Sequence, residues 1–355
     1  MASVEDVRKL ASQVVDPEMD LPLGDLRMIG DVTQDGQAFS VIVVPPTPAY
    51  PDQQRLVGLV TDAVSPSLAD GQTVSVSVEP TVRGKDAGGR IGLKVHNIIA
   101  VGSGKGGVGK STVAAALACG LHSFGCRVGL MDADVYGPSI PHMLGASGQP
   151  AATEHQGGEG QKLVRMEPID VDGLKLISMG FFIEQGQSVV WRGPMLHKAL
   201  TQFLKDTSWG ELDYLIIDLP PGTGDVSLTL SQQVGLAGAV IVCTPQQVAL
   251  LDAIKAVDMY QKVNVPVLGF VENMTGEIFG RGGAKKVAEE LKVPFLGEVP
   301  IDAKIREYGD AGKMMDLLKD DSPARDSLRA ACQSVAMQVA RNLTTTPAAP
   351  TLEIL

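Results

Sequence analysis

The stretch Gly104-Lys105-Gly106-Gly107-Val108-Gly109-Lys110-Ser111-Thr112 decides the fold of this chain. An apolar, β-type run at 95–103 leads into it, and an Ala- and Leu-rich segment at 113–121 follows, which predicts a strand, a loop and a helix in that order. From Gly104 the spacing is G-x-x-x-x-G-K-S, the pattern of a phosphate-binding loop. Its glycines let the backbone turn N–H groups toward phosphate oxygens, and the helix adds its positive end. The sequence therefore predicts a nucleotide site here.

Within this loop we expect Lys110 to contact the β- and γ-phosphates of ATP and the Ser111 hydroxyl to bind Mg²⁺. The rest of the expected ATP-binding loop consists of Gly104, Lys105, Gly106, Gly107, Val108, Gly109 and Thr112. The alternative is a glycine-rich strand–helix turn that binds nothing. The order of strand, loop and helix favours the phosphate site.

Lys105 places a second lysine at the start of the loop, which reads G-K-G-G-V-G-K-S. This variant resembles the deviant Walker A motif of the dimeric ATPases related to MinD, ParA and the nitrogenase iron protein. In that group the early lysine crosses the dimer interface to the partner's nucleotide. The resemblance implies a homodimer in which Lys105 is catalytic; a solvated surface lysine is the alternative.

Acidic residues stand at the ends of two further predicted strands. The apolar run 214–217 precedes Asp218 in a Walker B arrangement, and the run 128–131 precedes Asp132 and Asp134. Ligands bind at the carboxyl ends of parallel strands, where Asp218 would hold Mg²⁺ through water. By resemblance, Asp132 supports the magnesium side and Asp134 positions or activates the attacking water, next to the catalytic Lys110. Helix capping is the alternative for either residue.

The loop 219–225, Leu-Pro-Pro-Gly-Thr-Gly-Asp, cannot continue a strand, so we expect it to form a shaped loop over the γ-phosphate. The runs 239–246 and 267–274 predict two more strands with polar ends. Resemblance to related ATPases implies that the loop distinguishes ATP from ADP, that Asn273 contacts the adenine edge, and that the Pro300 region covers the base. Asn273 as a loop cap is the alternative.

The fold class expected is α/β: a mostly parallel P-loop NTPase sheet with a small N-terminal α+β domain. Residues 1–80 predict that small domain, with helices at 4–15 and 52–64, a hairpin of 26–32 and 39–44, and a strand at 74–78. Residues 81–94 are polar and glycine-rich, which predicts a flexible linker; 95–342 would be the ATPase domain and 343–355 a tail. Residues 146–160 are expected to be a mobile surface insertion.

Four motifs together resemble the Mrp/ApbC family. They are 132–139 (Asp-Ala-Asp-Val-Tyr-Gly-Pro-Ser), 191–194 (Trp-Arg-Gly-Pro), 219–225 and Glu272-Asn273-Met274. The N-terminal pattern of 16–18, 23–26 and 47–51 resembles the Mrp-associated domain, with Tyr50 where relatives commonly carry cysteine. The resemblance implies an ATP-dependent iron–sulfur cluster carrier or scaffold that acts as a homodimer with assembly proteins or client apoproteins. The usual C-x-x-C cluster site follows the Glu-Asn-Met motif.

That cluster site is absent from this sequence. Only Thr275, Gly276 and Glu277 stand between Met274 and Ile278, whereas iron–sulfur clusters need thiolates or, in some centres, histidine. The chain's cysteines form no C-x-x-C pair, and we expect them to be buried small hydrophobes: Cys119, Cys126, Cys243 and Cys332. No iron–sulfur ligands are identified. ATP and Mg²⁺ are the expected cofactors, and a cluster is implied by resemblance alone.

Composition limits the function classes. The net charge of −11 argues against nucleic acid as a partner, and no run of 18 apolar residues predicts a membrane span. The start of the chain lacks signal-peptide features, and the cysteine pattern suits the cytoplasm. Three functions stay open: an ATPase of iron–sulfur cluster assembly or transfer, a metal-free ATP-switched adaptor that delivers a client, and a MinD/ParA-like positioning ATPase. The third lacks the basic tail or face that it needs.

Overall fold

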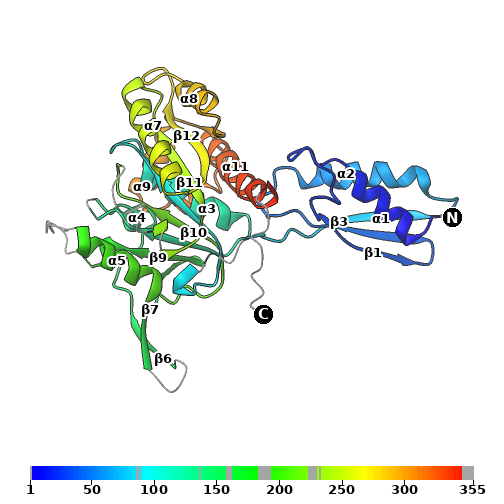
Figure 1. The fold of residues 1–355 in the computed structure, drawn as a ribbon, viewed down its shortest axis with the longest axis horizontal. Helices are drawn as coiled ribbons and strands as arrows, with labels where there is room; N and C mark the ends of the chain where they lie inside the picture. The colour runs from blue at the N-terminus through cyan, green and yellow to red at the C-terminus, as the bar shows by residue number, and fades with distance from the viewer. Residues whose placement is uncertain are drawn as a thin grey trace. The chain divides into compact units, whose positions relative to one another are not determined.

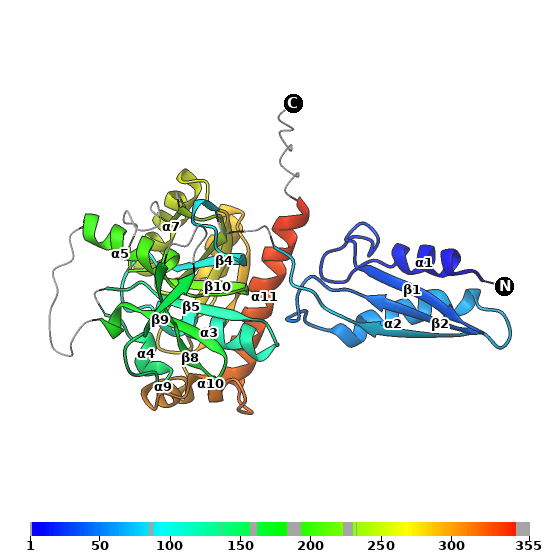
Figure 2. The same ribbon diagram turned by 90° about the horizontal axis from the view of Figure 1, so that it is seen from below.

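The computed structural model describes residues 2–84, 87, 89–135, 137–156, 162–182, 193–222, 230–231 and 233–345. Its contacts divide the chain into two units (Figures 1 and 2). One comprises residues 1–83 with the chain from Ala336 onward, and the other comprises Gly84–Val335. The boundary at 335/336 falls inside the last helix, α11 (Pro323–Thr345).

The first unit is a small α+β fold, as the sequence predicts. Its elements are α1 (Val4–Gln13), β1 (Ile29–Asp35), β2 (Ala38–Val43), α2 (Gln53–Val64), η1 (Ser65–Ser67) and β3 (Thr73–Val78). β1 and β2 are antiparallel, and β2 and β3 are parallel. A capping box of Ser3 and Asp6 starts α1, and the helix ends at Gln13 because Val14 is extended.

The second unit is built on one eight-stranded sheet in the order β13-β12-β11-β4-β10-β5-β9-β8. All neighbouring strands are parallel except β8 and β9, so the expected mostly parallel sheet is confirmed. Its strands are β4 (Val95–Gly102), β5 (Val128–Asp132), β8 (Ile169–Val171), β9 (Leu174–Ser178), β10 (Leu212–Asp218), β11 (Leu236–Cys243), β12 (Val267–Thr275) and β13 (Phe295–Pro300).

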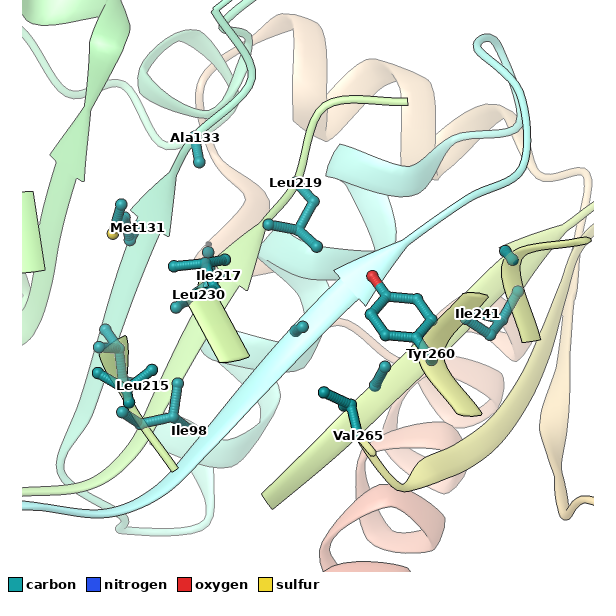
Figure 3. Close-up of a cluster of buried hydrophobic side chains, with 14 of the residues drawn as sticks. Ile98, Met131, Ala133, Leu215, Ile217, Leu219, Leu230, Ile241, Tyr260 and Val265 are labelled. Atoms are coloured by element: carbon teal, nitrogen blue, oxygen red, sulfur yellow. The ribbon is translucent and has the colours of Figure 1, made fainter. Parts of the chain in front are cut away.

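Helices cover this sheet on both faces (Figures 1 and 2). They are α3 (Lys110–Ser123), α4 (Ile140–Met143), η4 (Met179–Phe181), α5 (Gly193–Lys205), α7 (Gln247–Lys262), α8 (Gly283–Leu291), α9 (Ala303–Asp310), α10 (Met314–Leu317) and α11, with a short turn η2 (Gly89–Ile91) before β4. Small residues of α3 let it pack against β10, β5 and β4. Ile98 of β4, Ile217 of β10 and Tyr260 of α7 belong to one core cluster (Figure 3).

Two segments differ from the sequence-based expectation. Residues 152–156 of the expected mobile insertion form β6 (Ala152–Gln156), which pairs antiparallel with β7 (Lys162–Met166). The composition of 146–160 hides this pairing, because the partner strand lies outside the segment. In the expected flexible linker 81–94, the Thr81 N–H donates to Pro45 O, and Ala87 and Leu93 are buried. Thr81, Ala87 and Leu93 are therefore held by defined contacts, although the glycine content of 81–94 suggests a free chain.

Candidate functional site

The loop between β4 and α3 can exist only with glycine at several positions. Gly107 and Gly109 both have φ of +79°, a backbone region that favours glycine. A Cβ on Gly104 would lie 2.2 Å from the carbonyl oxygen of Asp252, and one on Gly109 would lie 2.1 Å from Nδ2 of Asn273. The helix α3 begins at Lys110, so the loop sits at a helix N-terminus, where backbone N–H groups and the helix dipole favour an anion.

Lys110 is the centre of a buried charged cluster at the carboxyl edge of the sheet. Its Nζ lies 2.7 Å from Oδ1 of Asp218, 3.5 Å from Oδ2 of Asp134 and 3.2 Å from Oγ of Ser111. Asp218 ends β10 and is in register with Asp132, which ends the neighbouring β5. The structure therefore brings together the lysine and the acidic residues that the sequence assigns to phosphate and metal chemistry.

Asp218 carries an oxygen that suits a metal ligand. Its Oδ2 is buried and has no hydrogen-bond partner among the residues that the structure describes. Burial raises the pKa of the Asp218 carboxyl, and the neighbouring Lys110 ammonium opposes that shift. A buried carboxylate oxygen with free lone pairs beside the Ser111 hydroxyl is a donor set that Mg²⁺ prefers. Ser111 and Asp218 thus fit the ion that the sequence predicts.

Asp132 has a different environment, because backbone and hydroxyl donors surround its carboxylate. Its Oδ2 accepts from Ser178 Oγ at 2.9 Å and from Ile140 N at 3.4 Å, and its Oδ1 accepts from Asp134 N at 3.2 Å. Burial, with a smaller contribution from the Asp218 charge, raises the pKa of Asp132 to about 7. Asp132 therefore accepts from the backbone N–H groups at both ends of the segment 134–140 and holds those ends in place.

Ser178 is a site residue that the sequence interpretation did not single out. It ends β9, is in register with Asp132, and also accepts from Gly180 N at 2.9 Å. The signal that could have found it is a polar residue at the end of an apolar strand, the same signal that identified Asp132 and Asp218.

A cavity of about 530 Å³ lies beside the loop. Thr112, Asn273 and Pro300, which the sequence places in the ATP site, all line it. Asn273 Nδ2 donates to Val108 O at 2.9 Å, which leaves its Oδ1 as the acceptor available to a ligand. The next residue, Met274, also lines the cavity and has a φ of +60°. The other lining residues are Ser139, His142, Met143, Phe279, Ile301, Asp302, Ile305, Arg306, Gly309, Asp310 and Met314.

Lys105 stands at the mouth of the loop and is half-buried. In the described part of the chain, no carboxylate lies within 4 Å of its ammonium group. The first half of the expected γ-phosphate loop is fixed, because Gly222 N donates to Ser103 O at 2.9 Å. Its second half, 223–225, lies outside the described residues, as do Trp191 and Arg192 of the family motif and the tail from 346 onward.

All four cysteines of the chain are buried, as expected, and none forms a disulfide. Burial raises the pKa of the Cys119 thiol, and it raises the pKa of Cys243 and of Cys332 to about 12. Within the described ranges no three His, Cys, Asp or Glu side chains gather as a metal site. The residues after Met274 form a closed turn in which Gly276 and Gly280 exchange both backbone hydrogen bonds, at 2.9 and 2.8 Å. These residues do not fit an iron–sulfur cluster.

The similarity to known proteins covers both units. Residues 94–336 match the family described as NUBPL iron-transfer P-loop NTPase, and residues 4–85 match the family described as iron-sulfur cluster assembly protein. The chain belongs to the iron-transfer P-loop NTPase family. The resemblance that the sequence motifs indicated is therefore confirmed.

This iron-transfer P-loop NTPase has similar relatives in several organisms. It is 46% identical over 345 residues to the iron-sulfur cluster carrier protein of Deinococcus radiodurans, which covers 92% of this chain and 93% of the relative. It is 46% identical over 255 residues to the Escherichia coli iron-sulfur cluster carrier protein, covering 69% of this chain and 67% of the relative.

Solved structures agree with the fold. A nucleotide-binding protein from Archaeoglobus fulgidus, in complex with ADP, is 37% identical to this iron-transfer P-loop NTPase, with a TM-score of 0.54. The match covers 66% of this chain and 91% of the Archaeoglobus fulgidus chain. The Pyrococcus furiosus cell-division ATPase MinD is 23% identical, with a TM-score of 0.51, and the match covers 68% of this chain and 98% of the MinD chain. At this identity the likeness shows the fold alone. A search of the described helices finds none long and apolar enough to cross a membrane.

Proposed function

We propose that this chain binds and hydrolyses Mg·ATP and uses that cycle to transfer iron–sulfur clusters to apoproteins. The observation that carries the nucleotide chemistry is the buried cluster in which Lys110 lies between Asp218 and Asp134 at the start of α3. The cluster-transfer role is supported by the family and by relatives named as iron-sulfur cluster carriers. Their names favour this function over the adaptor and positioning alternatives.

In the proposed reaction, the nitrogen atoms of the loop backbone bind the phosphates, and Lys110 exchanges its carboxylate contacts for β- and γ-phosphate oxygens. Asp134, once Lys110 has exchanged that contact for phosphate, orients the attacking water and takes up its proton as the γ-phosphoryl group transfers. Mg²⁺, held by Ser111 and through water by Asp218, would neutralise phosphate charge when bound. Asp132 supports this magnesium side indirectly, because it holds the backbone of Asp134.

The proposed adenine site is the cavity beside the loop. Asn273 directs its amide N–H₂ to the Val108 carbonyl, so its Oδ1 can accept from the exocyclic amine of adenine. An oxo group at that ring position would instead meet a second acceptor, which disfavours guanine. Pro300, which lines the same cavity, would cover the base.

We also propose that the active form is a homodimer and that it works in the cytoplasm. The position of Lys105 supports the proposed dimer. Lys105 stands at the loop mouth, whereas Lys110, in the buried cluster, is the lysine proposed to contact the phosphates of its own copy. A lysine in that place can reach a nucleotide bound to a second copy. Each copy would then complete the catalytic site of the other.

The cluster itself is treated as cargo that a thiol-bearing assembly protein or client holds. The four thiols of this chain are buried, and the turn after Met274 offers only the carboxylate of Glu277, which suits hard cations. We therefore assign to this chain the ATP-dependent step and to a partner the cluster ligands.

A cluster-transfer assay tests this function. A cluster-loaded thiol scaffold and an apo-acceptor are mixed anaerobically with Mg·ATP, with and without the chain, and acceptor activity is followed. We expect the wild type to accelerate transfer only with hydrolysable ATP, and Lys110→Ala to lose the effect. Val164→Asp, a change at an exposed site on β7, is the control. ATP hydrolysis without faster transfer would support the metal-free adaptor instead.

A further inference from the structure

Ser178 places a fully buried hydroxyl at the end of β9, next to the carboxylate of Asp132. β9 runs parallel to β5, and the two strands lie side by side in Figure 2, with Ser178 in register with Asp132. The Ser178 Oγ donates to Asp132 Oδ2 at 2.9 Å and accepts from Gly180 N at 2.9 Å. The hydroxyl therefore uses its one donor on a buried carboxylate and one of its acceptor positions on the backbone.

The Asp132 carboxylate connects this hydroxyl to two backbone positions further along the chain. Its Oδ1 accepts from Asp134 N at 3.2 Å, and its Oδ2 accepts from Ile140 N at 3.4 Å. Removing the Ser178 hydroxyl would leave Oδ2 with the Ile140 contact, the longest of these hydrogen bonds. The carboxylate could then rotate more freely, because the terminal torsion of an aspartate has broad minima. The Asp134 N–H would lose the fixed position of its acceptor.

The turn η4 contacts the same segment at a second place. A Cβ on Gly180 would lie 3.2 Å from Pro138 Cβ and 3.2 Å from Ser178 Oγ, so Gly180 packs closely against Pro138. The hydrogen bond from Gly180 N to Ser178 Oγ holds η4 in this place after β9 ends. Ser178 therefore supports the segment 134–140 both through Asp132 and through Gly180.

Asp134, at the start of this segment, is the residue that we propose to orient the attacking water. Its Oδ2 lies 3.5 Å from Lys110 Nζ at the carboxyl edge of the sheet. The preceding Ala133 donates its N–H to Asp218 O at 2.9 Å, and the N–H of Asp134 itself donates to Asp132. The backbone that aims the Asp134 carboxylate is thus held by both neighbouring strand ends. A displacement of about 1 Å at such a group can lower a rate about a hundredfold.

The cavity beside the loop depends less on Ser178. Ile140 begins α4, whose His142 and Met143 line the cavity. α4 also packs against α3 and α9, and Thr112 Oγ1 donates to Met143 Sδ at 3.9 Å. These contacts do not involve the Ser178 hydroxyl, so the cavity wall should stay in place without it.

From these contacts we infer that Ser178 is a positioning residue for ATP hydrolysis, which acts through Asp132 to hold the water-orienting Asp134. The inference rests on the proposed hydrolysis and adds a residue of β9, a strand that carries none of the phosphate-loop or magnesium residues. A hydroxyl that only stabilised the fold would affect melting without a selective effect on turnover.

The test compares Ser178→Ala with Ser322→Ala, a matched control in the same unit. Ser322 is also buried, its Oγ accepts from Arg325 N at 3.3 Å, and its hydroxyl bonds to the carboxylate of Asp320. Ser178→Ala should lower kcat about ten- to a hundredfold and leave ATP affinity at the wild-type value, measured by titration with a fluorescent ATP analogue. Ser322→Ala should lose a comparable hydrogen bond, melt at a lower temperature and keep the wild-type kcat.

A double-mutant cycle shows whether Ser178 acts through Asp132. Adding Ser178→Ala to Asp132→Ala should lower kcat little further, because both changes remove the same link to Asp134. Full additivity of the two effects on kcat would overturn the proposed route.

Hydrogen exchange, read by mass spectrometry without nucleotide, reports on the positioning independently of turnover. Peptides that contain Asp134 and Ile140 should exchange faster in Ser178→Ala than in the wild type, and at the wild-type rate in Ser322→Ala. Unchanged exchange there, an unchanged kcat, or equal losses of kcat and ATP affinity in Ser178→Ala would overturn the inference. A wild type that binds ATP without hydrolysing it would refute the proposed function instead, and the exchange comparison would still decide whether Ser178 holds the segment.

Discussion

Replacing Lys110 by alanine perturbs the buried charged cluster most directly. Its ammonium lies 2.7 Å from Asp218 and 3.5 Å from Asp134, and the Lys110 and Asp218 side chains are almost fully buried. Lys110→Ala leaves a buried carboxylate without its cation, which costs roughly 3–5 kcal/mol of unfolding free energy. For a unit of this size that corresponds to a melting temperature lower by roughly 6–20 °C.

The same change removes the cation that would meet the phosphates. A hydrogen bond to a charged group contributes roughly 1.5–3 kcal/mol, so we expect ATP affinity to fall by about ten- to a hundredfold or more. The two carboxylates left behind would also repel the phosphates. Loss of affinity should therefore exceed that expected from the missing contact alone.

The stability defect should depend on pH with a definite sign. Burial raises the pKa of Asp218, and losing Lys110 removes the charge that opposes this shift. The native variant then holds a proton that the unfolded chain releases above pH 3.8, so its stability falls as pH rises through that window. The gap between variant and wild type should shrink on acidification.

Thermal unfolding across pH and titration with a fluorescent ATP analogue measure these effects. Lys262→Ala is the control, since Lys262 pairs with Asp258 at 2.7 Å on the surface, where such pairs contribute about 0.3–0.5 kcal/mol. A folded Lys110→Ala protein that melts with the wild type and binds ATP equally well would refute the assignment of this cluster.

Three further predictions concern neighbouring residues. Asp134→Ala should keep ATP binding and lose turnover, because a water-positioning group acts in the transition state; equal losses in both would make Asp134 structural. Lys105→Ala should likewise lose hydrolysis more than binding, and mixing it with Asp134→Ala should restore part of the activity through hybrid dimers; the absence of rescue would count against a shared site. Asp132→Asn should flatten the pH dependence of the unfolding free energy. The pKa of Asp132 is about 7 in the native protein against 3.8 in the unfolded chain, so this carboxyl makes the wild type lose roughly 4 kcal/mol between about pH 4 and pH 7. An unchanged slope in the variant would show that Asp132 does not titrate in that range.

The sequence predicted the parts of this fold that depend on local pattern. The order of apolar run, glycine loop and small-residue helix located β4 and α3, and aspartates at strand ends located Asp132 and Asp218. These predictions are correct because strand ends and helix starts are set by residues close together in the chain. Parallel strands then bring their carboxyl ends to one edge of the sheet.

What the sequence could not predict depends on contacts between distant segments. The bond from Ser178 to Asp132 arises only because β9 pairs with β5, and the bond from Asn273 to Val108 joins residues far apart in the chain. β6 was missed for the same reason, since its partner β7 lies beyond the composition-defined insertion. The anchoring of Ala87 and Leu93 in the core is likewise a long-range effect.

Anaerobic reconstitution of the purified chain with iron and sulfide tests the central claim most directly. The claim is that this chain supplies ATP chemistry while a thiol-bearing partner holds the cluster, because Cys119, Cys126, Cys243 and Cys332 are all buried. We expect no stoichiometric iron or sulfide and no cluster absorbance after desalting, with ATPase activity unchanged. A stable [4Fe–4S] cluster on the wild-type dimer, lost in a single Cys→Ser variant, would contradict the account.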